Sequence, residues 1–372
     1  MYGQSPLSPC AVRSFAALLS LALAGCQQEY ELVQPVDVNP GDVTECGFTR
    51  VDDTAFYAYD CNPVFTATGE DWAPNVGSMA FNVTYVMGHP FYQLWYVAYD
   101  DDDNYAMGYA VSNNGTDWEP YPDNPLITDD GADSFEKDVM QANEVLWDPG
   151  RGQYVMIYSG LNLNGRSDGG TGVMTSPDGV AWDRIDANPV LLANDTGVPG
   201  IDGFCWPLDI NLVPGQGYTG YIAGTRGASG PCEGFRLDAS GPDDWTVDKD
   251  VAFPAGDDGE WDDEGLISLN EVELDGDHYL FYVGFGNWTV DGSVRTATNS
   301  YLGWARSDDG DDWSRESEPL PLNTTEEGEV SAVGAVTVGD RVHLWVTDNY
   351  DGETGVGLFL YDPDAAAAED GE

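Results

Sequence analysis

Carboxyl groups are the side chains whose spacing in this chain points most directly to chemistry. Asp138, Asp202 and Glu264 follow one another at intervals of 64 and 62 residues, and each lies shortly before a predicted strand. Carboxyl groups that converge can share acid–base catalysis, in which one protonates a leaving oxygen and another activates water or attacks. We expect these three acids to be catalytic, with Glu264 as the proton donor, because crowding among acids raises a carboxyl pKa towards neutrality.

Other side chains near these acids could bind a ligand. Aromatic faces suit amphipathic ligands such as sugar rings, and four tryptophans are candidates for stacking: Trp72, Trp206, Trp261 and Trp288. For Trp72 and Trp206, packing in the core is an equally good interpretation. Two arginines in predicted long loops could bond hydroxyl groups or pair with acids: Arg166 and Arg226. Two acids at similar places in predicted inner strands could line a channel or bond neighbouring backbone: Glu144 and Glu271.

The elements that carry these residues repeat along the chain. Five short extended segments close on a proline, at Pro63, Pro125, Pro189, Pro254 and Pro319, with steps of 62, 64, 65 and 65 residues. Upstream of the last four prolines lies a turn that ends in tryptophan: Trp118, Trp182, Trp245 and Trp313. A fixed period of this size indicates a repeat architecture built from one supersecondary unit.

Between successive prolines the sequence predicts four antiparallel strands, with the proline in the outermost one, where an edge tolerates it. The second strands have the clearest alternating aromatic and aliphatic pattern: residues 91–99, 154–159, 218–223, 279–283 and 342–347. Five four-stranded units predict an all-β, five-bladed β-propeller. The segment 48–65 supplies an outer strand that completes the last blade and closes the ring.

Connections at one end of the predicted blades are long, whereas those at the other end are short. The long ones include residues 160–170 and 284–300, and the short ones include Asp275–Gly276–Asp277. Long loops on a rigid scaffold are where binding and catalysis concentrate. We therefore expect the long-loop end of the ring to carry the function.

One phrase in this repeat resembles a known superfamily. It reads Gly108-Tyr109-Ala110-Val111 to Asp117-Trp118, continues to Asn124-Pro125-Leu126, and recurs within residues 172–190 and 303–320. Over residues 48–362 the pattern is similar to the five-bladed propeller glycoside hydrolases of families 32, 43, 62, 68 and 130. That resemblance implies a glycan in a central funnel and carboxylates from different blades.

The catalytic residues of those families cannot be carried over by motif, since the Asn-Asp-Pro-Asn-Gly, Arg-Asp-Pro and Glu-Cys-Pro motifs of family 32 are all absent. The first inner strand offers Ala80-Phe81-Asn82 in place of the Asp-Pro pair of family 43, and Asp263-Glu264-Gly265 only approaches its Glu-Gly-Pro motif. The sequence thus predicts a glycoside hydrolase-like propeller that acts on or binds neutral glycans. The alternatives are a non-catalytic propeller that binds glycan or protein and a structural envelope protein.

The N-terminus predicts export and attachment to a membrane. Residues 1–25 resemble a bacterial lipoprotein signal, since an apolar run leads into Leu23-Ala24-Gly25-Cys26 and is too short to span a bilayer. Cys26 would then be lipidated, and Gln27 after it implies the outer membrane, with the leaflet open. An ordinary signal peptide is the alternative. Residues 26–47 would form a linker and residues 363–372 a disordered tail.

Composition limits the partners. The formal net charge of −53 predicts a soluble monomer whose surface repels its own copies, and it argues against binding of nucleic acid. The acidic runs 100–103 and 308–312 could hold Ca²⁺ or be solvated turns, and neither matches a spaced calcium loop. No other cofactor or metal is expected, since His89, His278 and His343 lack ligand spacing.

Four cysteines remain if Cys10 is removed with the signal and Cys26 is lipidated. Exported chains tend to form disulfides, and four cysteines allow three connectivities. Proximity in the sequence favours Cys46 with Cys61 and Cys205 with Cys232.

Overall fold

The computed structural model describes residues 46–66, 70–73, 75–100, 104–128, 135–162, 169–194, 196–227, 230–291, 294–322, 330–350, 353–363 and 365. The chain divides into two units, residues 1–45 and 46–372, and all described residues belong to the second. Throughout these ranges, no helix has the length and apolar character needed to cross a bilayer. The predicted signal, Cys26, most of the linker, Arg166 and most of the tail lie outside the described residues.

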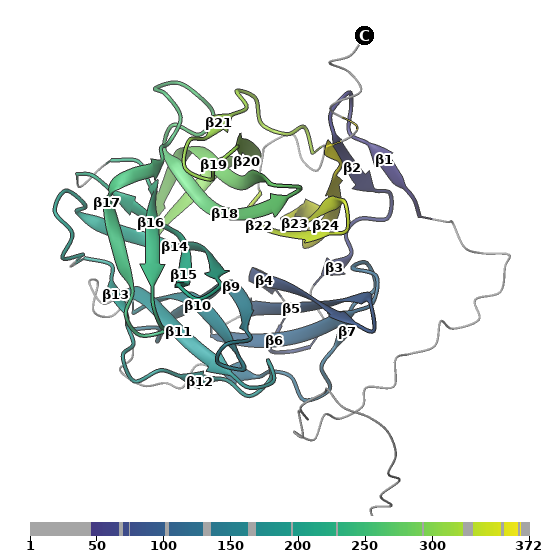
Figure 1. Cartoon of the computed structure of the whole chain (residues 1–372), viewed down its shortest axis with the longest axis horizontal. Coiled ribbons are helices and arrows are strands. Elements are labelled where there is room, and N and C mark those ends of the chain that lie inside the picture. The colour runs from purple at the N-terminus through teal and green to yellow at the C-terminus, as the bar shows by residue number, and fades with distance from the viewer. Residues whose placement is uncertain are drawn as a thin grey trace, which may run out of the picture. The chain divides into compact units, whose positions relative to one another are not determined.

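The second unit consists of five antiparallel sheets, the blades (Figure 1). Blade 1 contains β4 (Asn75–Val86), β5 (His89–Tyr99), β6 (Tyr105–Ser112), β7 (Glu119–Pro120) and β8 (Ile127–Thr128). Blade 2 contains β9 (Val139–Asp148), β10 (Gln153–Leu161), β11 (Gly170–Ser176), β12 (Asp183–Arg184) and β13 (Leu191–Leu192). Blade 3 contains β14 (Gly203–Val213), β15 (Gly217–Thr225), β16 (Glu233–Ala239) and β17 (Thr246–Phe253).

Blade 4 contains β18 (Gly265–Leu274), β19 (Asp277–Asp291), β20 (Val294–Ser307) and β21 (Ser314–Arg315). Blade 5 joins the two ends of the unit: β22 (Ala332–Val338), β23 (Arg341–Tyr350) and β24 (Glu353–Tyr361) with β1 (Phe48–Arg50), β2 (Phe56–Tyr59) and β3 (Phe65–Thr66). Both β2 and β3 pair with β24, so an N-terminal strand completes the last blade as predicted.

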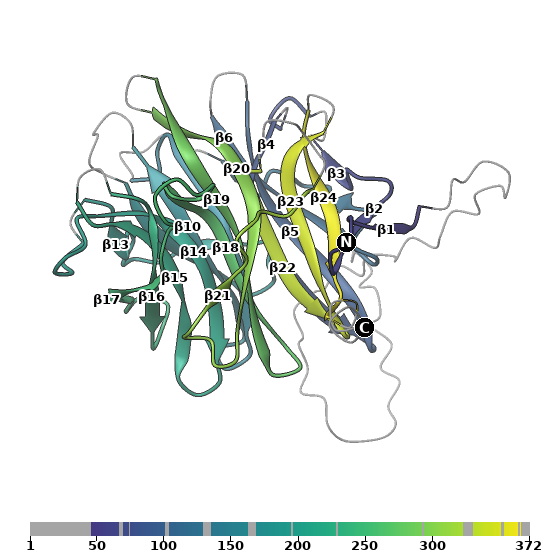
Figure 2. The same ribbon diagram turned by 90° about the horizontal axis from the view of Figure 1, so that it is seen from above.

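The inner strands β4, β9, β14, β18 and β22 surround the centre of the ring (Figure 1). Each contacts the next one, and β22 contacts β4, which closes the circle. Seen from the side, the blades lie next to one another with their long strands steeply inclined (Figure 2). The predicted five-bladed β-propeller is therefore confirmed.

The proline-containing segments form interrupted outer strands. In blades 1, 2 and 5, two short pieces pair with the same third strand on either side of an Asn-Pro step. Between those pieces the asparagine side chain replaces a strand residue. The amide of Asn124 accepts a hydrogen bond from the Tyr109 N–H at 2.9 Å and donates one to the Tyr109 carbonyl at 3.0 Å. Asn188 does the same with Val173, at 2.8 Å in both bonds.

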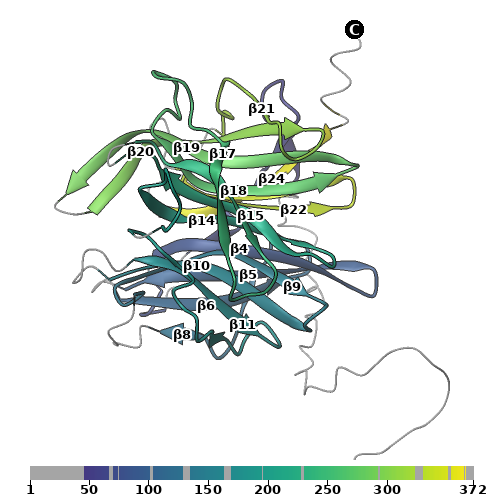
Figure 3. The same cartoon turned by 60° about the vertical axis from the view of Figure 1, so that its left-hand side comes forward.

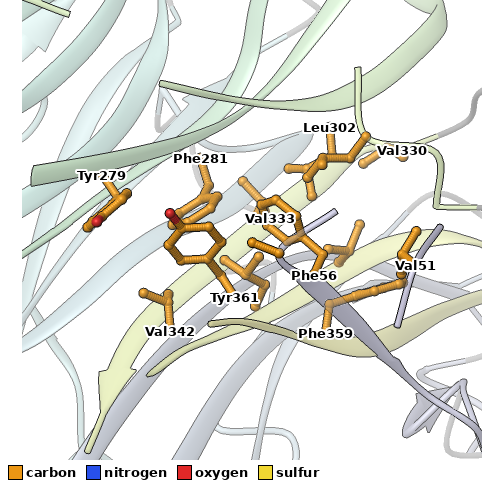
Figure 4. Packing of buried hydrophobic residues seen from close by; sticks show 14 of the residues in the cluster. Val51, Phe56, Tyr279, Phe281, Leu302, Val330, Val333, Val342, Phe359 and Tyr361 are labelled. Atoms are coloured by element: carbon orange, nitrogen blue, oxygen red, sulfur yellow. The ribbon is translucent and has the colours of Figure 1, made fainter. Parts of the chain in front are cut away.

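Hydrophobic cores fill the spaces between neighbouring blades. The cluster between blades 4 and 5 brings Phe56 of β2 against Phe281 of β19 and Tyr361 of β24, with ring centroids 6.2 and 5.0 Å apart (Figure 4). Phe56 is only 1% exposed. Burial of aromatic side chains of this size is a large favourable term, so the N-terminal strand stabilises the ring by packing as well as by backbone pairing.

Two features of the blades bear on the sequence predictions. Residues 284–300, expected to form a loop, are instead a continuation of β19 and β20, which pair as far as Asp291 and Val294 (Figure 3). Backbone pairing between β19 and β20 therefore extends blade 4 beyond the strands that the sequence predicted. The predicted disulfides are confirmed, since Cys46 is bonded to Cys61 and Cys205 to Cys232.

Candidate functional site

One residue of each inner strand lies at the same level of the ring. These residues pair with equivalent second-strand positions: Ala80 with Trp95, Glu144 with Ile157, Asp209 with Tyr221, Asn270 with Phe281 and Gly334 with Trp345. We call this set the central layer. It is polar in blades 2, 3 and 4 and small and apolar in blades 1 and 5.

The three polar side chains of the central layer bond to one another. The Asn270 amide nitrogen donates to Glu144 Oε2 at 2.8 Å and to Asp209 Oδ1 at 3.1 Å. Its carbonyl oxygen accepts a hydrogen bond from the Ala335 N–H of blade 5 at 3.1 Å. Since one nitrogen contacts both acids, their nearest oxygens lie no more than about 6 Å apart. Four of the five blades thus meet at the Asn270 amide.

Asp209 and Glu144 differ in their remaining contacts. Asp209 is 2% exposed, and its Oδ2 accepts hydrogen bonds from the Asn211 amide at 2.7 Å and the Glu271 N–H at 3.3 Å. Glu144 is half-buried, and its Oε1 accepts one from the Val145 N–H at 3.0 Å. Glu144 is therefore the more accessible acid of the pair.

Burial changes the protonation of this pair. Desolvation raises the pKa of Asp209 to about 7, against the opposing effect of the Asn270 hydrogen bond. Desolvation also raises the pKa of Glu144 well above its usual range, and the nearby charge of Asp209 raises it further. Two acids so close titrate as one unit. Near neutral pH the pair therefore retains a proton.

The register separates Glu271 from this pair. Asn270, and not Glu271, occupies the position in blade 4 that Glu144 occupies in blade 2. The Glu271 carboxylate contacts Arg236 at 3.1 Å and His278 Nδ1 at 3.0 Å. Its side chain therefore forms a polar contact between blades 3 and 4.

The three acids predicted to be catalytic also form a set. Asp138, Asp202 and Glu264 each immediately precede an inner strand. Their N–H groups donate to carbonyls at matching places in the second strands: Leu161 at 3.0 Å, Thr225 at 2.9 Å and Phe285 at 3.1 Å. We call them the rim acids. They lie at the same end of three successive blades, as the spacing predicted.

The rim acids and the central layer are separate levels. Glu264 precedes Asn270 by six residues along β18, a rise of about 20 Å for extended backbone. Asp138 lies 4.0 Å from Lys137 Nζ, and the Asp202 carboxylate accepts a hydrogen bond from the Gly227 N–H. The catalytic role of the rim acids stays a prediction.

Buried acids fix the loop before two of the rim acids. Two residues before Glu264, Asp262 is ion-paired with Arg315 at 2.9 Å and accepts a hydrogen bond from the Tyr282 hydroxyl at 2.9 Å. Two residues before Asp138, Glu136 is likewise ion-paired, with Arg184. Both acids are 1% exposed.

Sequence reasoning missed these ion pairs, although a signal was present. Trp182-Asp183-Arg184 and Trp313-Ser314-Arg315 place an arginine two residues after the repeated tryptophan in blades 2 and 4. These are the same two blades in which an aromatic residue and a buried acid precede the inner strand.

The predicted sugar-stacking tryptophans have packing contacts. Trp72 stacks on Tyr96 with ring centroids 5.9 Å apart, and Trp261 stacks on Tyr282 at 5.6 Å. Trp206 is half-buried against the core between blades 3 and 4. The backbone of Trp288 belongs to β19, whereas its side chain is outside the described residues. Stacking on sugars stays a prediction for all four.

The remaining predicted ligand residue, Arg226, lies over the Phe235 ring at 5.5 Å and donates to the Lys249 carbonyl at 2.8 Å. In the described part of the chain, no three His, Cys, Asp or Glu side chains are grouped so that they could hold a metal ion.

The fold is that of a five-bladed β-propeller, and solved structures of several glycoside hydrolases have a similar fold. A glycosyl hydrolase from Bacteroides ovatus is similar, with 19% identity, a TM-score of 0.57, and 86% of this chain and 94% of that chain covered. The β-1,2-mannobiose phosphorylase from Listeria innocua, solved with β-1,2-mannobiose, has 12% identity, a TM-score of 0.60, and 85% and 99% covered. The Bombyx mori GH32 β-fructofuranosidase BmSUC1 has 17% identity, a TM-score of 0.53, and 80% and 61% covered.

These similarities confirm the predicted fold. No protein-family model matches the sequence, and no curated protein matches it. At such low identity a shared fold does not carry an activity with it, so function has to be argued from the site.

Proposed function

We propose that this chain is a glycoside hydrolase-like propeller that acts on neutral glycans in a carboxylate-lined central funnel, entered from the long-loop end of the ring. The observation that supports this proposal is the Glu144–Asp209 pair, in which two neighbouring blades bring carboxyl groups to one amide nitrogen. Pairs of acids whose environments separate their pKa values are typical of acid–base catalysis. Similar folds in solved glycoside hydrolases agree with this class of substrate.

In this proposal Glu144 is the acid, because its pKa is raised well above the usual range and its side chain is half-buried. It transfers its proton to the glycosidic oxygen as the bond to the anomeric carbon breaks. Because the nearest oxygens of the two acids lie no more than about 6 Å apart, close to the spacing of a retaining pair, Asp209 attacks that carbon as the nucleophile. Glu144 then takes the proton from the water that releases the sugar from Asp209, so proton and leaving group are both accounted for. The rim acids Asp138, Asp202 and Glu264 hold the glycan hydroxyls at the entrance.

The test is a hydrolysis screen on neutral oligosaccharides with Glu144→Gln, Glu264→Gln and Glu273→Gln. Glu144→Gln keeps the shape but removes the titratable proton, and we expect it to lower the rate by about 10²–10⁴-fold. Glu273→Gln, an exposed acid on β18, is the matched control and should leave the rate unchanged. A loss in Glu264→Gln with full activity in Glu144→Gln would move the donor role to the rim.

A second candidate function is glycan binding without hydrolysis. It is favoured by the central layer itself, where Ala80, Asn270 and Gly334 occupy the positions at which blades 1, 4 and 5 could have brought further acids. Binding of glycans in the absence of any cleavage would establish this alternative, in which the chain is a lectin-like propeller.

The proposed location is the bacterial cell envelope, with a lipid on Cys26. The sequence Leu23-Ala24-Gly25-Cys26 supports this location, and the two disulfides agree with an oxidising compartment. Replacing Cys26 with Ser should move the protein out of the membrane fraction, as measured by fractionation and immunoblotting. Unchanged membrane retention would mean that lipid on Cys26 is not the main attachment.

A further inference from the structure

The hairpin that joins β4 and β5 is longer than the four equivalent hairpins at the short-loop end of the ring. In blades 2 to 5 the inner strand ends four residues after the central layer, at Asp148, Val213, Leu274 and Val338. In blade 1 it continues for six residues, from Ala80 to Val86. The two extra residue pairs extend this hairpin, drawn in blue in Figure 3, by about 7 Å.

The extension is apolar and exposed. Tyr85 is 56% exposed, Val86 53% and Met87 97%, and together they are half of the large hydrophobic residues that are exposed within the described ranges. We call these three residues the hairpin tip. No Asp, Glu, Lys or Arg occurs between Asp71 and Asp100, although the chain contains 66 acids. The tip is therefore an uncharged apolar protrusion on a strongly acidic protein.

The turn itself departs from ordinary turn chemistry. Met87 and Gly88 have φ angles of 53° and 84°, the left-handed pair of a type I′ turn. The equivalent turn of blade 4 has Asp275 and Gly276 at 56° and 91°. Asp, Asn and Gly suit the first position, whereas a methionine there is strained and gains no burial. An apolar side chain is thus present where local structure favours a polar one.

We propose that the hairpin tip docks into a lipid surface. Tyrosine is enriched at the headgroup level of membranes, and a few apolar side chains at a convex tip can enter the interface. The acidic turns at Asp275 and Asp340 end about 7 Å further back, which is close to the screening length of about 8 Å at physiological salt. The uncharged tip can therefore reach the lipid while the acids remain in solvent.

Other occupants fit these observations less well. A stable protein interface buries about 800 Å² on each partner, which three side chains on a protruding turn do not supply. A second copy of the chain would bring two strongly acidic bodies together, and like charge opposes that.

Docking at the tip has a consequence for orientation. The tip lies at the short-loop end of blade 1, whereas the rim acids lie at the opposite end of the strands. Lipid contact through the tip would direct the long-loop end away from the membrane. This inference does not rest on the proposed glycan chemistry.

The test is sedimentation with vesicles of the zwitterionic lipids phosphatidylethanolamine and phosphatidylcholine, which carry no net charge to repel the acidic chain. The parent is the full chain with Cys26→Ser, so that no lipid is attached, and the variant adds Tyr85→Ser, Val86→Ser and Met87→Asn. We expect the ratio of bound to free protein to fall about tenfold. The unfolding temperature should not fall, because Asn suits the left-handed position better than Met.

The matched control is Leu192→Ser, which removes another exposed apolar side chain, 43% exposed, from the outer edge of blade 2. It should sediment like the parent. Equal vesicle binding by the tip variant and the parent would overturn the proposal. So would a parent that ignores vesicles but loses a protein partner when the tip is replaced, since the surface would then serve protein binding.

Discussion

At the scale of single residues, Asn270 decides what the two central acids can do. A carboxylate in its place would have no N–H groups to offer Glu144 and Asp209, whereas the amide offers two. The same amide accepts a hydrogen bond from Ala335 of the next blade. A neutral side chain thus holds two acids together without adding a third charge.

The central acids give the folded protein a particular dependence on pH. Burial raises the pKa of Asp209 to about 7, above its value in the unfolded chain. The folded protein therefore keeps a proton that the unfolded chain releases at lower pH. The contribution of this group to stability falls as pH rises from about 4 to about 7.

Replacing Asn270 with Asp should sharpen this effect. The variant loses both donors and adds a third buried acid, so we expect a loss of about 3 kcal/mol in the free energy of unfolding, larger at pH 8 than at pH 5. Thermal unfolding at the two pH values with disulfides intact measures it. Gln141→Glu adds an acid at an exposed position of β9 and should change little. A pH-independent loss in Asn270→Asp would refute the proton-sharing interpretation.

At the scale of elements, the sequence predicted the second strand of each blade better than it predicted the outer strand that contains the proline. The second strand predicted at residues 91–99 is β5 (His89–Tyr99), and the one predicted at 154–159 is β10 (Gln153–Leu161). Alternation of buried aromatic and aliphatic residues specifies these strands locally. The proline segments were harder, because the side chains of Asn124 and Asn188 provide the pairing that backbone would otherwise make.

The acids of the candidate site also differ in how well the sequence predicts their positions. Asp138, Asp202 and Glu264 could be predicted from the sequence because each directly precedes an inner strand. The position of Asp209 could not be predicted, because its level in the ring depends on two register shifts in the pairing of β14 with β15. The pairings of β9 and β18 with their second strands have one register shift each. Such bulges re-aim side chains without any clear sequence signal.

At the scale of the whole molecule, residues that repeat hold the ring together, and residues that break the repeat occupy the central layer. The Asn-Pro steps recur in blades 1, 2 and 5 with the same backbone contacts. The central layer, by contrast, has five different residues at its five positions. A symmetric scaffold thereby supports an asymmetric centre, with its acids confined to two adjacent blades.

Ring closure depends on Phe56, which enters from the N-terminal strand and packs between blades 4 and 5 (Figure 4). Phe56→Ala should lower the free energy of unfolding by about 3–5 kcal/mol, the usual cost of removing a buried phenylalanine. It should also speed hydrogen exchange in β24, because β2 covers the edge of that strand. Phe48→Ala removes a 40% exposed ring from β1 in the same segment and serves as the control. If both variants lost stability equally, or if exchange in β24 stayed unchanged in Phe56→Ala, the N-terminal strand would not be what closes the ring.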